Sequence, residues 1–489
     1  MFSYTLQRVF FWTLVLLFFV TTGVLIFYAL GYRFSFERGI FIHAGSISVK
    51  PNPQQVNITI NSSPVSRKKL NYLNNSYHID GLKPGEYQLK ISSPGFQAWS
   101  KKVAVHSGTS TEFWNVLLAK EQYPRTSFYT SQAGKFFLSL KSKYIAYIQN
   151  QGQEFLVNIL SLDSALSETV FSSPDYELDE KESIQWSPQE HAIIIPTNQK
   201  NPEERKKHYF IVDIDTKRAI NLKDLAAAEN IESVHWNTTK KNFVYYLTER
   251  NLYRLDLGSP QEKKLVAQNI SGFNLSSSGL YYFQLPSGIV YRADPEGERP
   301  PVQITTSPPA DMSNTNYQIV VYDEKRIALL NETSRKIFIW NQGDHDNYFR
   351  ELSENASGAQ FSDDGKKLLF WNDWEIFVYF SRDWEVQPVR LENELMNITR
   401  FSQKIENVQW SKDYEHVVFT TDKKIKVVEL DHRDRRNIFD ITALKIDYSW
   451  LISDFSNNKL YFTDKASEED PFFEIYSIDF PEKTGILGL

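Results

Sequence analysis

Hydrophobic residues follow three different patterns along this chain, and each pattern predicts a different element. The first is an apolar run from Val9 to Tyr32 that contains no charged residue. A helix of this length would reach about 36 Å, which is enough to cross a hydrocarbon core of about 30 Å. We therefore expect a transmembrane helix over residues 9–32, preceded by a short N-terminal tail over residues 1–8.

Two alternatives exist for this apolar run. A cleaved signal peptide has an apolar core of about 7–15 residues, which is shorter, although Ala29-Leu30-Gly31 has the small residues of a cleavage site. A buried core helix is disfavoured because the segment is apolar on all sides. We therefore expect an uncleaved anchor. Since no second run of this length occurs, we expect the chain to cross the membrane once.

The second pattern is an alternation of apolar and polar positions between residues 44 and 119. This period of two is typical of half-buried antiparallel strands. The apolar positions fall on one face of each predicted strand: Ile47 and Val49, then Val56, Ile58 and Ile60, then Tyr87, Leu89 and Ile91. Asp80-Gly81, Pro84-Gly85 and Pro94-Gly95 predict tight turns, because Pro presets φ and Gly accepts positive φ. The two Pro-Gly pairs predict a hairpin with one turn at its entrance and another between its strands.

The third pattern is a repeat that occupies residues 127–489. An aromatic or other hydrophobic residue precedes Ser or Asn, a polar turn follows, and two apolar strands come next, as in "AQFSDDGKKLLFW" (Ala359–Trp371). Copies recur about every 40–50 residues, which is typical of a β-propeller whose blades bury their faces against each other. Eight candidate blades can be counted, with seven as the alternative; the copies lie at 134–148, 184–196, 234–247, 273–283, 316–330, 359–371, 408–420 and 453–463. In the turn, Ser and Asp are expected to accept backbone hydrogen bonds, and Gly to take positive φ.

Composition narrows the classes of function. The formal net charge of −6 gives no global reason to expect a nucleic-acid partner. Basic runs such as Arg205-Lys206-Lys207 and Arg433–Arg436 are interpreted as solvated loops. The chain has no cysteine, which excludes disulfides, thiol nucleophiles and cysteine zinc sites.

The search for catalytic or metal-binding motifs finds no candidate residue. The nine histidines are scattered without metal-ligand spacing, and no nucleophile elbow, P-loop or dinucleotide fingerprint occurs. "GDHDNYF" (Gly343–Phe349) lacks the acidic ladder of a calcium loop and is interpreted as a polar turn. Acidic residues at strand ends, such as Asp213, Asp256 and Asp431, are interpreted as turn caps. We therefore predict no catalytic residue, no metal site and no cofactor.

Two parts of the chain resemble known families. "GLKPGEYQLKISSPGFQAWSKKVAV" resembles the second half of a PEGA domain, with matches at Gly81, Leu82, Pro84, Gly85, Tyr87, Gly95 and Phe96. The resemblance implies a small β-sandwich of a surface or envelope protein, with a role in binding or spacing and no catalytic residues to carry over. Phe361 to Lys366 resembles the WD40-like repeat of TolB-type propellers. The expected fold class is therefore all-β, with one transmembrane helix, a PEGA-like sandwich and a propeller of seven or eight blades.

Three functions are compatible with this organisation. We favour a non-enzymatic, membrane-anchored envelope protein whose PEGA-like module and propeller bind a protein or cell-wall glycan partner. The alternative is an envelope hydrolase or lyase with its site in the propeller channel, which would need converging carboxylates or a Ser/His pair. The charges that flank the apolar run do not decide its orientation, and the resemblance favours an extracytoplasmic location for most of the chain. A reversed topology would make the propeller an intracellular adaptor.

Overall fold

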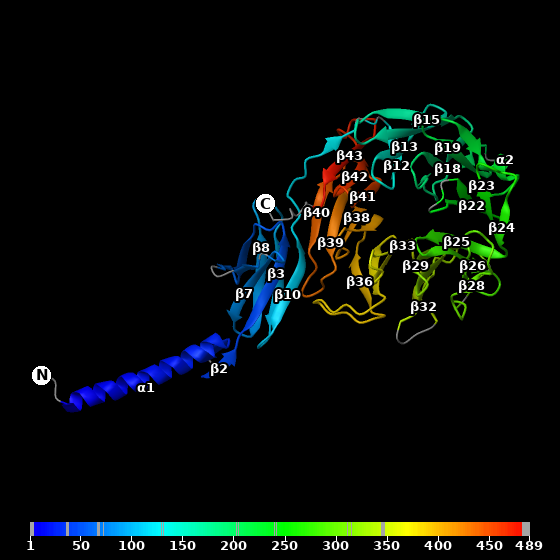
Figure 1. Cartoon of the computed structure of the whole chain (residues 1–489). Helices are drawn as coiled ribbons and strands as arrows, with labels where there is room; N and C mark the ends of the chain where they lie inside the picture. Colours follow the sequence, from blue (N-terminus) through cyan, green and yellow to red (C-terminus); the bar gives the residue numbers. More distant parts are fainter. Residues whose placement is uncertain are drawn as a thin grey trace.

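A computed structural model shows an exposed N-terminal helix, a small β-sandwich and a ring of β-sheets (Figure 1). It describes residues 4–35, 39–65, 69–71, 73–128, 130, 132–201, 203, 205–238, 240, 242–310, 312–313, 315–343 and 348–481. The centre of the predicted polar turn "GDHDNYF", residues 344–347, lies outside this set.

The apolar run forms helix α1, Tyr4–Ala29, which begins earlier and ends earlier than the predicted bounds of 9–32. The helix ends before Tyr32 because Gly31 takes a φ of +90° and Arg33 donates to the Tyr28 carbonyl at 3.0 Å, which satisfies one of the last helical acceptors. Strands β1 (Tyr32–Ser35) and β2 (Ile40–His43) follow as a hairpin. The stretch Gln7–Ala29 is apolar and long enough to cross a membrane, and none of it is buried by the rest of the molecule.

The second segment is a sandwich of two four-stranded sheets. The first sheet has the order β10-β3-β7-β6: Ser110–Leu117, Gly45–Asn52, Ser76–Leu82 and Lys69–Asn71. The second has the order β5-β4-β8-β9: Ser63–Pro64, Asn57–Ile60, Gly85–Ser92 and Trp99–Val105. The predicted inward faces of β3 and β8 are confirmed, with Ile47, Val49, Leu89 and Ile91 fully buried. β8 and β9 form the predicted hairpin around Gly95.

The predicted turn at Asp80-Gly81 is wrong, because β7 runs through both residues to Leu82. The pairing of β7 with β3 shifts by one residue between Ile79 and Leu82, and Gly81 takes a φ of +75° there. The Asp-Gly pair therefore forms a β-bulge, which needs the same positive φ as a turn.

The ring consists of eight sheets, which confirms the count of eight blades over the alternative of seven. We number the blades 1–8 in chain order. Blades 1–4 comprise β12 Ala133–Leu138, β13 Tyr144–Gln151, β14 Glu154–Ser161 and β15 Ser167–Ser173; β16 Tyr176–Leu178, β17 Gln185–Trp186, β18 Ala192–Gln199, β19 Lys207–Asp213 and β20 Ala219–Asn221, with helix α2 Leu222–Ala226; β21 Ser233–Trp236, β22 Phe243–Thr248, β23 Asn251–Asp256 and β24 Lys264–Ala267; and β25 Ile270–Ser276, β26 Gly279–Gln284, β27 Ile289–Ala293 and β28 Val302–Gln303. Blades 5–8 comprise β29 Tyr317–Asp323, β30 Arg326–Asn331, β31 Ile337–Asn341 and β32 Phe349–Ser353; β33 Gly358–Phe361, β34 Lys367–Trp371, β35 Glu375–Phe380 and β36 Leu395–Arg400; β37 Glu406–Trp410, β38 His416–Thr421, β39 Lys424–Glu429 and β40 Ile438–Ala443; and β41 Leu451–Asp454, β42 Lys459–Asp464 and β43 Glu474–Asp479.

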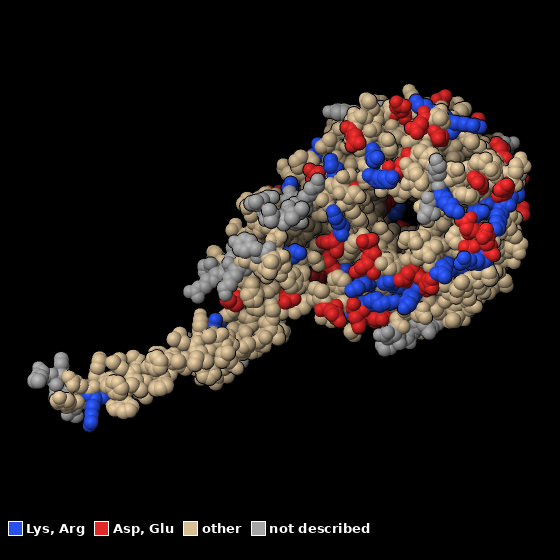
Figure 2. Space-filling view, in the orientation of Figure 1, with Lys and Arg blue, Asp and Glu red and all other residues tan. Residues whose placement is uncertain are grey.

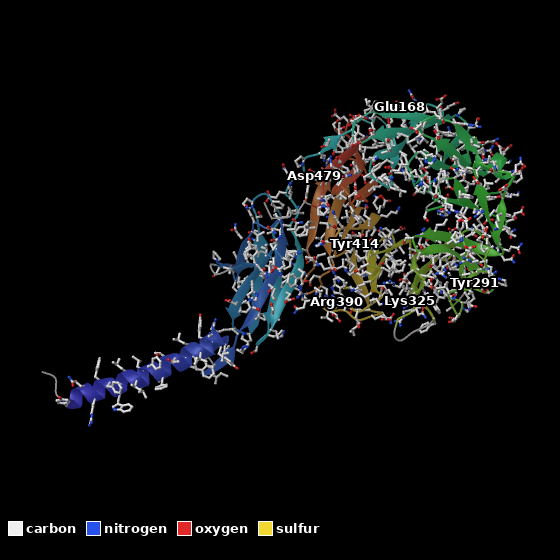
Figure 3. All side chains as sticks on the ribbon, viewed as in Figure 1. Glu168, Tyr291, Lys325, Arg390, Tyr414 and Asp479 are labelled. Carbon is white, nitrogen blue, oxygen red and sulfur yellow. The ribbon has the colours of Figure 1, made fainter. Side chains whose placement is uncertain are left out.

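The ring closes through a strand from the other end of the propeller. β11, Thr126–Ser127, pairs with β43 and so supplies the fourth strand of blade 8. Each boundary between neighbouring blades encloses its own apolar cluster, as between blades 1 and 2 and between blades 6 and 7, and side chains fill these boundaries (Figure 3). This arrangement buries both faces of sheets that could not be stable alone.

The repeated motif performs the expected turn chemistry and also joins neighbouring blades. Ser362 Oγ accepts from the Lys367 amide at 3.0 Å, Asp364 accepts from the Lys366 amide at 3.0 Å, and Gly365 takes a φ of +63°. Four tryptophan indole N–H groups donate to a backbone carbonyl in an adjacent blade: Trp186 to Phe137, Trp236 to Gln185, Trp410 to Gln360 and Trp450 to Phe136, at 2.6–3.3 Å. Trp186, Trp236 and Trp410 occupy the aromatic position of the motif, whereas Trp450 precedes the copy at 453–463. In three of these four bonds the motif thus joins neighbouring blades, which the turn chemistry alone does not predict.

Candidate binding site

The sandwich and the propeller share one core. The apolar cluster of the sandwich continues through Trp99 and Phe113 into blades 7 and 8, where Val427 and Phe439 are among its members. Among the described residues, the sandwich contributes to no other cluster in the ring. Because this core is continuous, separation of the two parts would expose apolar surface to water.

Strand β9 is an edge strand of the sandwich, and the propeller covers that edge. The loop between β39 and β40 supplies Asn437, whose side chain accepts from the Ser100 amide and donates to the Ser100 carbonyl, both at 3.3 Å. Asp434 of the same loop accepts from the Lys102 amide at 2.8 Å. The loop therefore satisfies backbone groups that an exposed edge would offer to other chains.

A buried ammonium group lies at the centre of this junction. Lys101 is fully buried, and its Nζ lies 2.7 Å from Glu429 Oε1 and 2.9 Å from the carbonyl oxygens of both Asp431 and Arg435. A lysine ammonium has three N–H donors, so each donor has an acceptor. Such a group is stable away from water only because it is paired and fully hydrogen-bonded.

Glu429 is equally well satisfied. Its Oε2 accepts from the Trp99 indole at 2.7 Å, and its Oε1 accepts from the backbone and side-chain nitrogens of Asn437 at 2.7 and 2.8 Å. The carboxylate thus joins two residues of the sandwich, Trp99 and Lys101, to one loop of the propeller. This geometry fixes the position of β9 relative to β39.

Two further contacts hold the sandwich in place. Gln387 of the blade 6 loop accepts from the Glu112 amide and donates to the Ser110 carbonyl, both at 2.9 Å. The Arg433 guanidinium donates to the Glu112 carbonyl at 2.7 Å and lies 3.9 Å from the centre of the Phe113 ring. Strand β10 is therefore attached to blades 6 and 7, in addition to the attachment of β9 to blade 7.

The segment that leaves the sandwich is also anchored. Arg125 forms an ion pair with Asp464 at 2.6 Å and donates to Thr442 at 2.7 Å. The Asp464 side chain is fully buried, and its other oxygen accepts from the Lys445 amide at 2.8 Å. This pair precedes the closing strand β11 and ties it to blades 7 and 8.

The propeller also has a cavity of about 770 Å³ that is lined by strands and loops of blades 1, 2, 7 and 8. Three carboxylates line it, and two of these are paired: Glu177 with Arg205 at 2.9 Å and Glu406 with Lys404 at 2.8 Å. Figure 2 shows cationic and anionic side chains intermixed around the opening of the ring. This face has no single charge that would favour a strongly acidic or strongly basic ligand.

The buried carboxyls with raised pKa values lie in ion pairs within the propeller. Burial raises the pKa of Glu182 despite the Lys207 ammonium at 2.5 Å, and burial likewise raises the pKa of Glu415 despite its ion pair with Lys367. Each carboxyl has a lysine partner, an arrangement that also occurs in structural ion-pair networks.

The acidic residues at strand ends act as predicted. Asp213 accepts from the Thr216 amide, Asp256 from the Gly258 amide and Asp431 from the Arg433 amide, at 2.8–2.9 Å. Across the described part of the chain, no three His, Asp or Glu side chains converge in a way that could hold a metal ion. His345 lies outside that part.

Sequence reasoning missed the residues of the junction. Lys101 follows Trp99 and precedes Val103 and Val105 at the same period of two, so the alternation places it on the inward face of β9. A lysine at an inward position between apolar neighbours is a signal that a buried acidic partner exists. The partner, Glu429, is more than 300 residues away in the sequence and could not be identified from it.

Comparison with known proteins agrees with this architecture. Residues 44–121 match the PEGA domain family, and no curated protein matches the chain. Solved structures that resemble it include the Dos1 propeller, with 11% identity over 73% of this chain and 94% of that one and a TM-score of 0.46. The β-propeller domain of the Trilobed protease from Pyrococcus furiosus has 13% identity over 72% and 94%, with a TM-score of 0.36. An oligogalacturonate lyase in complex with manganese has 11% identity over 74% and 98%, with a TM-score of 0.36. The family match and the ring of eight sheets show that the chain carries a PEGA domain between an N-terminal apolar helix and a C-terminal β-propeller.

Proposed function

We propose that this protein is a non-enzymatic, membrane-anchored protein of the cell envelope, in which the PEGA domain and the propeller form one rigid binding surface for a protein or cell-wall glycan. The buried junction around Lys101 and Glu429 carries this proposal. A flexible spacer would not need a shared core and a fully satisfied buried ion pair. A scaffold that presents both domains to one partner requires a fixed geometry between them.

Membrane anchoring is supported by the way α1 joins the rest of the chain. Besides capping the helix, the Arg33 guanidinium stacks 3.7 Å from the centre of the Tyr28 ring. His43 of β2 contacts the Leu30 carbonyl at 3.0 Å. The helix end is thus integrated with the hairpin β1–β2, which favours a retained anchor over a segment that is removed.

The topology can be tested by cysteine labelling, because the natural chain has no cysteine. Ser277 is exposed in a loop of blade 4, and Ser277→Cys in intact cells should react with a membrane-impermeant maleimide. A cysteine introduced within residues 1–3 should react only after permeabilisation. The reverse result would place the propeller in the cytoplasm, and a shortened, soluble chain would indicate a cleaved signal peptide.

The non-enzymatic role can be tested with purified cell-wall glycan. The full chain in detergent micelles should be retained on the glycan or on a protein partner attached to it, and should release no soluble fragments. The cavity lined by Glu177, Glu180 and Glu406 favours the alternative of a hydrolase or lyase. Release of fragments that is abolished by Glu180→Gln and Glu406→Gln would support that alternative and refute the non-enzymatic role.

A further inference from the structure

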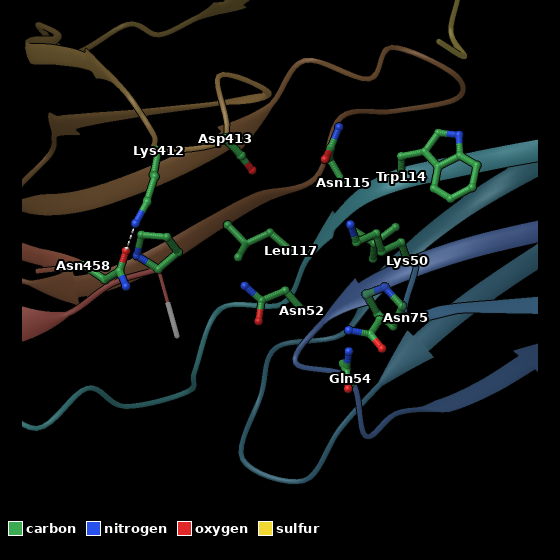
Figure 4. Close-up of a pocket in the computed structure, with 13 residues that line it drawn as sticks. Lys50, Asn52, Gln54, Asn75, Trp114, Asn115, Leu117, Lys412, Asp413 and Asn458 are labelled. Atoms are coloured by element: carbon green, nitrogen blue, oxygen red, sulfur yellow. Dashed lines mark hydrogen bonds between the residues drawn. The ribbon is translucent and has the colours of Figure 1, made fainter. Parts of the chain in front are cut away.

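A cavity of about 520 Å³ lies where the PEGA domain meets blades 7 and 8. Lys50, Gln54 and Trp114 approach it from the PEGA domain, and Lys412 and Asn458 approach it from the propeller (Figure 4). Its size is typical of sites for small ligands. The cavity exists only because the junction holds the two domains together.

A β-bulge directs two PEGA side chains towards this cavity. The pairing of β10 with β3 shifts by one residue between Phe113 and Val116, so Trp114 and Asn115 occupy the bulge. Bulges commonly re-aim side chains next to functional sites. The Trp114 indole donates to Glu112 Oε2 at 2.9 Å, and the backbone amide of Glu112 donates to Gln387. The indole is half-buried and its N–H has a partner, so its ring can serve as an apolar platform.

Polar side chains with unused hydrogen-bonding capacity surround this platform. Within the described residues, the side chains of Lys50, Gln54, Asn75 and Asn115 line the cavity and make no hydrogen bond to the protein. Each carboxamide can donate two hydrogen bonds and accept two. A ligand with several hydroxyl or acetamido groups would satisfy this set, whereas a purely apolar ligand would leave it unsatisfied.

The charge of the cavity favours an anion. Lys412 donates one hydrogen bond to Asn458 at 2.7 Å and retains two further N–H donors. Asp413 is the acidic residue in the lining, and its carboxylate already accepts from the His416 ring at 2.7 Å and from two backbone amides. The ammonium groups of Lys50 and Lys412 are therefore available to a carboxylate or phosphate.

We propose that this cavity binds an acidic saccharide. The apolar face of a pyranose ring would stack on Trp114, and hydroxyl or acetamido groups would bond to the carboxamides. The anionic groups of the saccharide would pair with the ammonium groups of Lys50 on the PEGA side and of Lys412 on the propeller side (Figure 4). The inference rests on the proposed function, since it names the ligand class of that binding surface. Because the ligand would contact both domains, it would also stabilise their junction.

The test is titration calorimetry on the full chain in detergent micelles, with four chemically defined probes. The probes are a neutral N-acetylglucosamine tetramer, a tetramer that alternates N-acetylglucosamine with glucuronate, a glycerol-phosphate oligomer and an acidic peptide. We expect the glucuronate tetramer to bind more tightly than the neutral tetramer, because only the former offers carboxylates to Lys50 and Lys412. The glycerol-phosphate oligomer is anionic but has no pyranose ring, so binding of this probe in place of the saccharides would mean that phosphate is recognised without stacking on Trp114.

Variants then locate the site. Trp114→Ala should weaken binding about tenfold, and Trp114→Phe should restore most of it because the ring remains. Trp374→Ala is the matched control, since Trp374 is an exposed tryptophan of blade 6 outside the cavity. Lys50→Gln and Lys412→Gln should weaken binding of the acidic probes several-fold and leave the neutral tetramer unchanged.

Three results would overturn the inference: no probe binds, the peptide or the glycerol-phosphate oligomer binds in place of the saccharides, or Trp114→Ala binds as well as the natural chain. Equal effects of the lysine variants on neutral and acidic saccharides would overturn its acidic component. None of these results would alter the cysteine-labelling topology or the retention on whole cell-wall glycan. Failure of this inference can therefore be distinguished from failure of the proposed function.

Discussion

Replacing Lys101 with methionine should loosen the junction between the PEGA domain and the propeller. Methionine has a similar length but no charge and no donor, so Glu429 would lose its counter-ion while its side chain stays 4% exposed. The carbonyl oxygens of Asp431 and Arg435 would lose a donor as well. The substitution therefore leaves one buried charge and two acceptors without their partner.

The magnitude follows from the burial of the pair. Removal of one member of a buried, hydrogen-bonded ion pair costs about 3–5 kcal/mol. At about 1.4 kcal/mol per factor of ten, the equilibrium between docked and undocked domains should shift by roughly two to nearly four powers of ten.

Hydrogen–deuterium exchange on the full chain in detergent micelles can measure this shift. The amides of Ser100 and Lys102 point away from β8 and are protected by Asn437 and Asp434 of the propeller, so their exchange reports opening of the junction. Peptides that cover β9 should exchange faster in Lys101→Met by the predicted factor, whereas peptides from blades 3 and 4 should not change. Lys102→Met is the matched control, because Lys102 pairs with Glu86 at the surface, and its loss should leave exchange in β9 nearly unaltered.

The double variant Lys101→Met/Glu429→Gln separates the charge effect from lost packing. Since it leaves no unpaired charge, it should be less destabilised than the sum of the two single variants. Additive effects, or an exchange rate in Lys101→Met that equals the rate of the Lys102→Met control, would refute the view that this ion pair fixes the two domains.

The remaining predictions concern the ring. Trp410→Phe keeps an aromatic ring but leaves the Gln360 carbonyl without its inter-blade donor, so it should lower the urea-unfolding free energy by about 2 kcal/mol; an unchanged value would contradict a role for the indole N–H. Arg125→Leu removes the partner of the fully buried Asp464 side chain, which should lower the free energy of unfolding by about 2–3 kcal/mol after allowance for the partly exposed arginine. Limited proteolysis should then cut the variant faster next to β11, and a cleavage rate equal to that of the natural chain would contradict this prediction. Burial lowers the pKa of the half-buried His235 to about 4, so the unfolded chain takes up the proton first and stability should fall as the pH drops from about 6.5 towards 4. A melting-temperature series over this range should be flatter for His235→Phe, and an identical slope in both proteins would show that His235 is not responsible.

Local patterns predicted the architecture because they act over short distances in the sequence. Six blades carry a clear copy of the hydrophobic-Ser/Asn-turn-strand motif and two carry weaker copies, at 134–148 and 316–330, so eight copies could be counted before the ring was seen. The bulge at Gly81 was predicted as a turn because both require positive φ, and only the pairing register distinguishes them. The end of α1 was misplaced because the apolar run continues past Ala29, whereas the helix stops before Gly31.

The junction and its cavity depend on contacts between distant segments. The sequence places Lys101 on an inward face but gives no indication that the loop 431–437 meets it. The cavity likewise requires Trp114 and Lys412 to be neighbours, and they are separated by most of the propeller. Such pairs of residues can be recognised only in the folded chain, where closure of the ring places blades 7 and 8 next to the PEGA domain.

The two-residue strand β11 also sets a condition on how the protein is made. Thr126 and Ser127 leave the ribosome, or a translocation channel, long before their partners Tyr476 and Ser477. Individual blades can form as local hairpins during synthesis, but blade 8 lacks its fourth strand until β43 has emerged, and the edge of β9 is uncovered until residues 434–437 arrive. Since unpaired strand edges favour aggregation, the nascent chain needs protection until nearly its whole length has been synthesised.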